Sequence, residues 1–391
     1  MTPPWMDEPP VRLLLAALAS GGVAARFVGG CVRDWLLGRS IADIDVAVDK
    51  PPDVVMRALE TAKIKVVPTG IRHGTVTAVV EGRPFELTTL RRDVETDGRR
   101  AVVAFTDNWR QDAERRDFTF NALYAEPDGT IHDYFDGRAD LAAGKVRFIG
   151  DPDQRIAEDR LRVLRFFRFH AWYGRPPFDG PGFDACRRNA ATIRGLSGER
   201  VRKELLRTLE APGDAAADAV DAMFEAGALD HWLPECAGSA RLRALASRED
   251  EADGPRRLAA ILPPGADATT IGKRLKLSTQ EALRLSLMLD REHVVDPGNL
   301  RASLYRLGTQ LFIDRALLDG PGDWRAALVL ARTWTPPELP IGGADALALG
   351  LKPGPKVGAL IEAVERWWIE GDFAANRAAC LAELRRLAQA E

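Results

Sequence analysis

The sequence predicts an α+β protein, in which a small head of mixed sheet and helices is followed by a long all-α part. Short runs rich in β-branched residues alternate with helical runs over the first 150 residues. After about residue 151 the strand pattern disappears, and apolar residues recur at helical spacing between Gly- and Pro-rich breaks. Because 391 residues exceed one ordinary hydrophobic core, we expect about two to four domains.

The elements of the head follow from local patterns in chain order. We expect a strand at 26–28, a short helix at 32–37, a strand at 44–48, and two paired strands at 75–80 and 84–90. The turn Glu81-Gly82 separates the last two strands. In the helical part, Ser197 is placed to cap a helix over residues 198–209.

Composition excludes several classes of protein. The chain has 46% hydrophobic and 28% charged residues, which is typical of a globular protein. No apolar run approaches the length of a bilayer span, and we find no secretory pattern at the N-terminus. The four cysteines form no CxxC pair, which predicts free thiols in a reducing cytoplasm and no zinc site.

The charge pattern favours a local nucleic-acid contact over a general one. A formal charge of −3 does not suit a general polyanion binder, so an RNA partner requires a basic patch. The segment from Arg155 to Arg175 supplies one, because six arginines face only two acidic residues there and aromatic residues lie between them.

The first chemical motif is Gly29-Gly30-Cys31-Val32-Arg33-Asp34, which leaves the first predicted strand and enters a helix. Two glycines allow a phosphate to approach the backbone closely, and the free N–H groups at a helix start attract anions. Arg33 can add a charge-assisted contact. An ordinary tight turn is the alternative for this motif alone.

The second motif is a pair of acidic residues, Asp43 and Asp45, in a segment otherwise suited to a buried strand. Side chains at i and i+2 leave a strand on one face, so the two carboxylates lie side by side. Such a pair is costly unless a cation separates the charges, and magnesium binds a few carboxylates together with substrate phosphates. A solvated strand edge is the alternative. Glu86 has the parity to add a third carboxylate, although a solvent-facing residue explains it equally well.

Two further segments carry paired charges. In Arg115-Arg116-Asp117-Phe118-Thr119-Phe120-Asn121, the polar residues suit triphosphate and ribose contacts. Asp159, Arg162, Arg165 and Arg168 step by three residues, which places neighbours close together on a helix surface. A carboxylate and a guanidinium together can match the amine and ring nitrogen of cytosine and adenine, but not uracil or guanine. A salt-bridged amphipathic helix is the alternative.

Together these motifs resemble the class II CCA-adding tRNA nucleotidyltransferases and their close relatives, the bacterial poly(A) polymerases. The resemblance runs from about Phe27 to Tyr173, with the motifs in order. It implies a polymerase-β-like nucleotidyltransferase head over 1–150, a helical neck that recognises the base over 151–210, and a helical body and tail that bind tRNA over 211–391. The implied activity is addition of CCA to the tRNA 3′ end from CTP and ATP in the cytoplasm, with magnesium, two ions being expected, and with no membrane or protein partner.

The resemblance also assigns roles to residues. Asp43 and Asp45 match magnesium ligands, and we group Glu86 with them as a catalytic candidate. The expected nucleotide contacts comprise the glycine turn, the motif arginines, and Asp159 with Arg162 as the pair that selects the base: Gly29, Gly30, Arg33, Arg116, Asp159, Arg162, Arg165 and Arg168.

Residues at about 90–108 resemble the flexible loop that such enzymes need to switch from C to A addition. The sequence of this segment, together with Phe135-Asp136-Gly137 downstream, is most similar to the mitochondrial-type branch of these enzymes. This favours full CCA addition over CC-only addition and over poly(A) synthesis. The alternatives are a poly(A) polymerase, a catalytically silent RNA-binding protein that keeps the fold, and a small-molecule nucleotidyltransferase.

Overall fold

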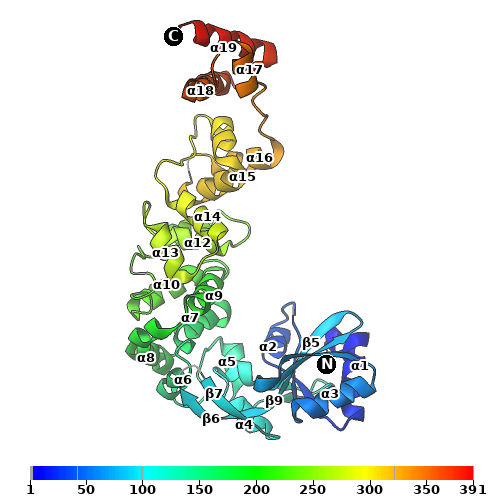
Figure 1. The fold of residues 1–391 in the computed structure, drawn as a ribbon. Helices are drawn as coiled ribbons and strands as arrows, with labels where there is room; N and C mark the ends of the chain where they lie inside the picture. Colours follow the sequence, from blue (N-terminus) through cyan, green and yellow to red (C-terminus); the bar gives the residue numbers. More distant parts are fainter. Residues whose placement is uncertain (1–2, 42, 98–99, 321, 391) are drawn as a thin grey trace. The chain divides into compact units, whose positions relative to one another are not determined.

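The computed structural model describes residues 3–41, 43–97, 100–320 and 322–390. It forms two compact units, the first comprising Met1–Gly238 and Arg274–Lys276, the second Ser239–Lys273 and Leu277–Glu391. Figure 1 traces the elements along the chain. The α+β head followed by an all-α continuation is confirmed, because every strand of the described residues lies before residue 133. The predicted divisions at 150 and 210 fall inside the first unit and stay predictions.

A mixed seven-stranded sheet forms the head, in the order β3-β4-β5-β2-β1-β8-β9. Its centre pairs β2 (Asp45–Val48) in parallel with β5 (Arg83–Thr89) and antiparallel with β1 (Ala25–Val28). The outer strands are antiparallel to their neighbours: β3 (Lys65–Gly70), β4 (Thr75–Val80), β8 (Tyr124–Ala125) and β9 (Ile131–His132). The β4–β5 pair predicted around the Glu81-Gly82 turn is confirmed.

Two amphipathic helices, α1 (Pro9–Ser20) and α3 (Pro52–Thr61), pack together and against the sheet. Their buried leucines and valines meet the inward positions of β4, where burial alternates residue by residue. This alternation is the expected result of strand geometry with one face on a core. The predicted short helix is α2 (Gly30–Leu36), which begins directly after β1.

The segment expected as a loop near 90–108 is instead a two-stranded antiparallel hairpin, followed by helix α4 (Trp109–Glu114). The strands are β6 (Arg91–Asp97) and β7 (Arg100–Phe105), and residues 98–99 lie outside the described part. The sequence carries β-branched residues at Val94, Thr96, Val102 and Val103, which favour strands. The many charges of the segment hid this signal. Its role in switching from C to A stays a prediction.

The helical part of the first unit contains η3 (Thr119–Ala122), α5 (Gly137–Ala143), α6 (Pro152–Glu158), α7 (Arg162–Tyr173), α8 (Gly180–Asn189), α9 (Gly198–Leu209) and α10 (Ala215–Glu225). Helix α7 packs against α9 and α10. Helix α9 begins where Ser197 predicts, although the Ser197 side chain makes no capping hydrogen bond.

Among its described residues the second unit contains helices and their connections but no strand. Its helices are α11 (Ala240–Ala246), α12 (Gly254–Ala260), α13 (Ala268–Leu275), α14 (Thr279–Leu289), α15 (Leu300–Asp319), α16 (Trp324–Thr333), α17 (Gly343–Ala348), α18 (Pro355–Glu370) and α19 (Arg377–Ala390). The end of α13, from Arg274, belongs to the first unit. Among all described helices of the chain, none combines the length and apolar character that crossing a bilayer demands.

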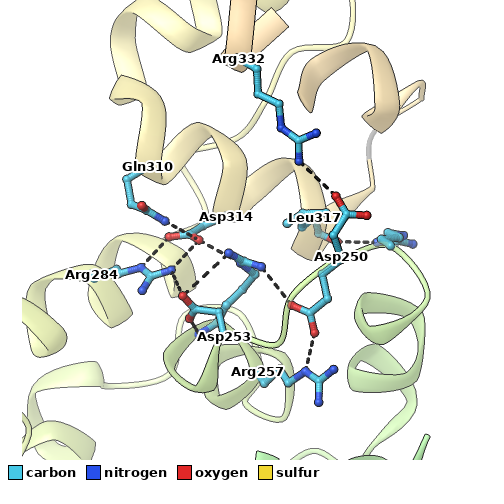
Figure 2. A network of polar contacts seen from close by, with 11 residues as sticks. Asp250, Asp253, Arg257, Arg284, Gln310, Asp314, Leu317 and Arg332 are labelled. Carbon is cyan, nitrogen blue, oxygen red and sulfur yellow. Dashed lines mark hydrogen bonds and ion pairs between the residues drawn. The ribbon is translucent and has the colours of Figure 1, made fainter. Parts of the chain in front are cut away.

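A buried ion network joins α12, α14 and α15 (Figure 2). Asp314 is fully buried and accepts from Arg256 Nε at 3.0 Å and from Arg284 Nε at 2.8 Å. Arg284 also donates to Asp253 at 2.9 Å, and Glu249 accepts from Arg256 at 3.0 Å. Because buried charges are tolerated only when paired and hydrogen-bonded, this network fixes the relative positions of the three helices.

Candidate active site

The turn between β1 and α2 is open to the approach of arginine side chains. Gly29 has φ +72°, a conformation that favours glycine. A Cβ on Gly29 would lie 3.7 Å from Arg116 Nη1, and one on Gly30 would lie 3.8 Å from Arg33 Nη2. The predicted phosphate turn therefore faces two guanidinium groups.

The acidic residues gather beside this turn. Asp45 opens β2 and is the direct partner of Glu86 in the parallel pairing with β5, so their side chains leave the same face. Asp43 and Asp45 are exposed, whereas Ile44 is buried. The predicted alternation is thus confirmed, but the strand starts at Asp45 and not at residue 44 as expected, because the ladder with β5 extends no further than Asp45.

The electrostatics of the acidic residues fit a divalent cation. The pKa of Asp45 is raised because surrounding protein atoms displace water and because Glu86 and Asp43 add negative charge, while Arg116 opposes the shift. A bound cation would relieve this repulsion. Within residues 3–41, 43–97, 100–320 and 322–390, no group of three or more His, Cys, Asp or Glu side chains is arranged to hold a metal. Magnesium needs only one or two carboxylates when phosphate oxygens complete its shell, so the donor set suits that ion.

Asp112 holds the motif arginines in place. This buried carboxylate accepts from Arg115 Nε at 2.9 Å, from Arg116 Nη2 at 3.2 Å and from the Tyr124 hydroxyl at 2.6 Å. Burial alone would raise the pKa of Asp112, but the two arginines outweigh burial and hold it far below its usual range. Arg116 is thereby fixed toward Gly29.

A second chain of contacts links Arg33 to α7. Arg33 is 8% exposed, and it donates to Asn121 Oδ1 at 2.7 Å and to the Tyr173 hydroxyl at 2.7 Å. Asn121 donates in turn to Asp117, which accepts from Arg165 Nε at 2.7 Å. Burial would raise the pKa of Asp117, but Arg165 and Asn121 lower it to about 2. The head and α7 are therefore tied together through the ionised Asp117–Arg165 pair and through the neutral Asn121 and Tyr173 side chains.

The base-selecting series is not one continuous helix surface, so that part of the prediction is wrong. Helix α6 ends at Glu158 and α7 begins at Arg162, which leaves Asp159 in an extended conformation between them. The Asp159 side chain accepts from the Leu161 N–H at 3.1 Å, which suits a chain break better than a helix interior. Asp159 pairs with Arg200, whose Nη2 lies 3.0 and 2.9 Å from its two oxygens, and Arg162 pairs with Glu158 at 2.6 Å.

Helix α9 supplies the acid that neutralises the rest of the series. Glu204 is 4% exposed and lies 3.0 Å from Arg168 Nε and 3.7 Å from Arg165 Nη1. Burial raises the pKa of Glu204, while the two arginines oppose that shift.

One open cavity of about 440 Å³ brings most of the predicted residues together. The predicted residues that line it are Gly29, Gly30, Arg33, Asp45, Arg116, Asp159, Arg162 and Arg165. Asp43 and Glu86 are not among its walls, and Arg168 lines a neighbouring cavity. The walls combine carboxylates, including Asp45 and Asp159, with a glycine turn and six arginines (Arg33, Arg91, Arg115, Arg116, Arg162 and Arg165). The cavity can therefore hold a polyanion beside a cation and a polar ring edge.

Several supporting residues escaped the sequence argument: Asp112, Tyr124, Tyr173, Arg200 and Glu204. Arg200 and Glu204 stand four residues apart on α9 directly after the predicted cap. That spacing places them on one helix face. Only the packing of α7 on α9 shows that this face meets Asp159 and Arg168.

Comparison with known proteins gives two family matches. Residues 25–147 match the model described as the poly A polymerase head domain. Residues 183–238 match the model described as the probable RNA and SrmB-binding site of polymerase A.

The chain is also similar to individual proteins and to a solved structure, in each case over nearly its whole length. It is 33% identical to a mitochondrial CCA tRNA nucleotidyltransferase 1 from Danio rerio, over 92% of this chain and 86% of that protein. It is 31% identical to a CCA-adding enzyme of Limosilactobacillus fermentum, over 93% of each chain. The crystal structure of the Bacillus stearothermophilus CCA-adding enzyme in complex with CTP matches with a TM-score of 0.82 at 28% identity, over 98% of both chains.

Proposed function

Because the chain belongs to the family of CCA-adding tRNA nucleotidyltransferases, we propose that it adds CCA to the 3′ end of tRNA from CTP and ATP. The observation that carries this function is the single cavity in which Asp45, the Gly29-Gly30 turn and the Asp159–Arg162 pair meet. A protein that only binds RNA needs no carboxylate such as Asp45 beside a phosphate-binding turn. The silent-fold alternative therefore lacks support.

The chain's own groups are arranged to bind and orient the triphosphate. Arg33 and Arg116 flank the glycine turn, and both are held by neighbouring side chains, so little reorganisation is needed when the substrate binds. Preorganised positive groups stabilise charge that develops on the phosphates during transfer. We propose Gly29 and Gly30 as the backbone that approaches the phosphates.

Asp43 and Asp45, with Glu86 beside them, are the residues we propose to hold magnesium, as two ions. When bound, such ions would neutralise the triphosphate and polarise the attacking 3′ hydroxyl. The repulsion that raises the pKa of Asp45 supports this assignment.

Base selection is proposed for Asp159 and Arg162. An ionised carboxylate has about four acceptor sites, so Asp159 can keep Arg200 and still accept from the amine of cytosine or adenine. Arg162 is anchored by Glu158 and can donate to the ring nitrogen. We assign Arg165 a supporting contact with the nucleotide. Arg168 lines a different cavity.

We propose that the protein acts in the cytoplasm. All four cysteines are free, which suits a reducing compartment. The body and tail, residues 211–391, are proposed to bind tRNA.

The decisive experiment is one gel with purified protein, magnesium, CTP and ATP, and a tRNA that ends before its CCA. We expect three added nucleotides and then a stop. Continued growth with ATP would replace this function by poly(A) synthesis. If no product forms with a tRNA that is a competent substrate, both CCA addition and poly(A) synthesis are refuted. Asp45→Ala serves as the inactive control, and Asp53→Ala, an exposed acid on α3, serves as the matched active control.

A further inference from the structure

A second cavity adjoins the nucleotide cavity. It measures about 350 Å³ and is lined by Arg33, Arg168, Phe169, Trp172, Tyr173 and Arg207. Arg33 and Phe169 line both cavities. Arg33, which faces the proposed triphosphate site, therefore separates the two cavities.

The aromatic rings of this cavity serve mainly to hold guanidinium groups. Arg33 lies 4.0 Å from the Tyr173 ring centre, and Arg39 lies 4.7 Å from it. The Arg168 guanidinium lies 4.4 Å from the Phe169 ring centre. These contacts are within the cation–π range, so Phe169 and Tyr173 already hold guanidinium groups, and Trp172 is the wall ring without a cation–π contact among the described residues.

The charged side chains in the walls of this cavity are arginines, and each has an acidic partner outside the walls: Asp34 for Arg33 at 3.0 Å, Glu204 for Arg168 at 3.0 Å and Glu210 for Arg207 at 3.4 Å. Its walls contain three guanidinium groups, and no carboxylate belongs to the walls within the described part of the chain. Arg168 has one ion-pair partner, Glu204, through Nε, and its other N–H donors have none among the described residues. Burial lowers the pKa of Arg168, and the opposing charge of Glu204 does not fully offset this shift.

We infer that this cavity is a second phosphate-binding subsite, which receives the pyrophosphate released from the nucleotide cavity past Arg33. Three arginine side chains, of which Arg168 and Arg207 each have a single acidic partner in the described part of the chain, suit a compact polyanion. The inference deepens the proposed function and rests on it for the source of the anion. It gives Arg168 the role of binding the leaving group in place of the incoming nucleotide.

Arg207 allows a clean test, because it lies outside the proposed catalytic residues and is mostly exposed, with a weak i,i+3 partner in Glu210. We would titrate inorganic pyrophosphate by calorimetry into the full chain saturated with magnesium and a non-hydrolysable CTP analogue. Arg207→Gln and Arg207→Glu are compared with Arg187→Gln, another exposed arginine with an i,i+3 acid.

The wild type and Arg187→Gln should bind one further pyrophosphate, and Arg207→Gln should weaken this binding roughly fivefold, with a greater loss for Arg207→Glu. In parallel, the KM for tRNA lacking CCA distinguishes the other phosphate source. An increase in this KM with unchanged pyrophosphate affinity would support the subsite but assign its phosphate to the RNA backbone. No change in either quantity would overturn the inference. A wild type that binds pyrophosphate but adds no CCA would instead contradict the proposed function.

Discussion

Asp117→Asn tests how the head is joined to α7. The Asp117 carboxylate is 7% exposed and accepts from Asn121 at 3.0 Å and from Arg165 at 2.7 Å. The substitution keeps the size of the side chain but removes its charge. Arg165 is then left with Glu204 at 3.7 Å as its remaining acidic partner among the described residues.

The pKa shift gives the magnitude. The pKa of Asp117 falls from 3.8 to about 2, and one pKa unit corresponds to about 1.4 kcal/mol, so the charge contributes about 2 kcal/mol at neutral pH. Because the folded pKa is depressed, this stability is complete above pH 3.8 and is lost as the pH falls toward 2. Asp117→Asn should therefore lower the free energy of unfolding of the first unit by about 2 kcal/mol at pH 7.

The assay is urea unfolding of the full chain, with the transitions of the two units fitted separately. Asp184→Asn is the matched control, because Asp184 forms an exposed ion pair with Arg187 at 2.8 Å. This substitution should lower the free energy of unfolding by less than about 1 kcal/mol. We also expect Asp117→Asn to weaken CTP binding, since Arg165 loses its anchor. Equal stabilities of the two variants would refute the reasoning.

Arg162→Ala should reduce the preference for CTP and ATP over UTP in single-nucleotide incorporation while leaving the Kd for tRNA nearly unchanged; full discrimination would remove its role in base selection. Burial lowers the pKa of His170 from 6.5 to about 4, so the wild type should lose up to about 3 kcal/mol of stability as the pH falls from 6.5 toward 4. His170→Phe should lack this loss, and equal slopes of stability against pH would contradict the shift. Asp314→Ala should destabilise the second unit by about 3–5 kcal/mol in urea unfolding, whereas Asp250→Ala, at an exposed pair, should change it by less than about 1 kcal/mol; similar losses would argue against the buried network.

The sequence predicted the elements whose patterns are local. The β-branched run at 75–80, its turn and its partner strand appear as expected, and so does the glycine turn that leads into α2. The exposure of Asp43 and Asp45 around the buried Ile44 also follows from a period of two.

What the sequence could not supply depends on contacts between distant segments. The break at Asp159 arises where α6 gives way to α7, and Asp159 is held there by Arg200 from α9, 41 residues away. Asp112 has no recognisable pattern of its own, and it acquires its role only when β6, Arg116 and Tyr124 meet around it. The spacing of three residues therefore predicted that Asp159, Arg162 and Arg165 line one cavity. It did not predict their ion-pair partners, the separate cavity of Arg168 or the backbone that carries them.

The central claim is that β2 and β5 present carboxylates that bind a divalent cation against the triphosphate. The most direct measurement is a titration of Mn²⁺ by electron paramagnetic resonance, with CTP present, on the wild type, Asp45→Asn and the surface control Asp53→Asn. We expect the wild type and the control to bind Mn²⁺ in the ternary complex with equal affinity, and Asp45→Asn to lose that binding. Undiminished Mn²⁺ affinity in Asp45→Asn would contradict the account.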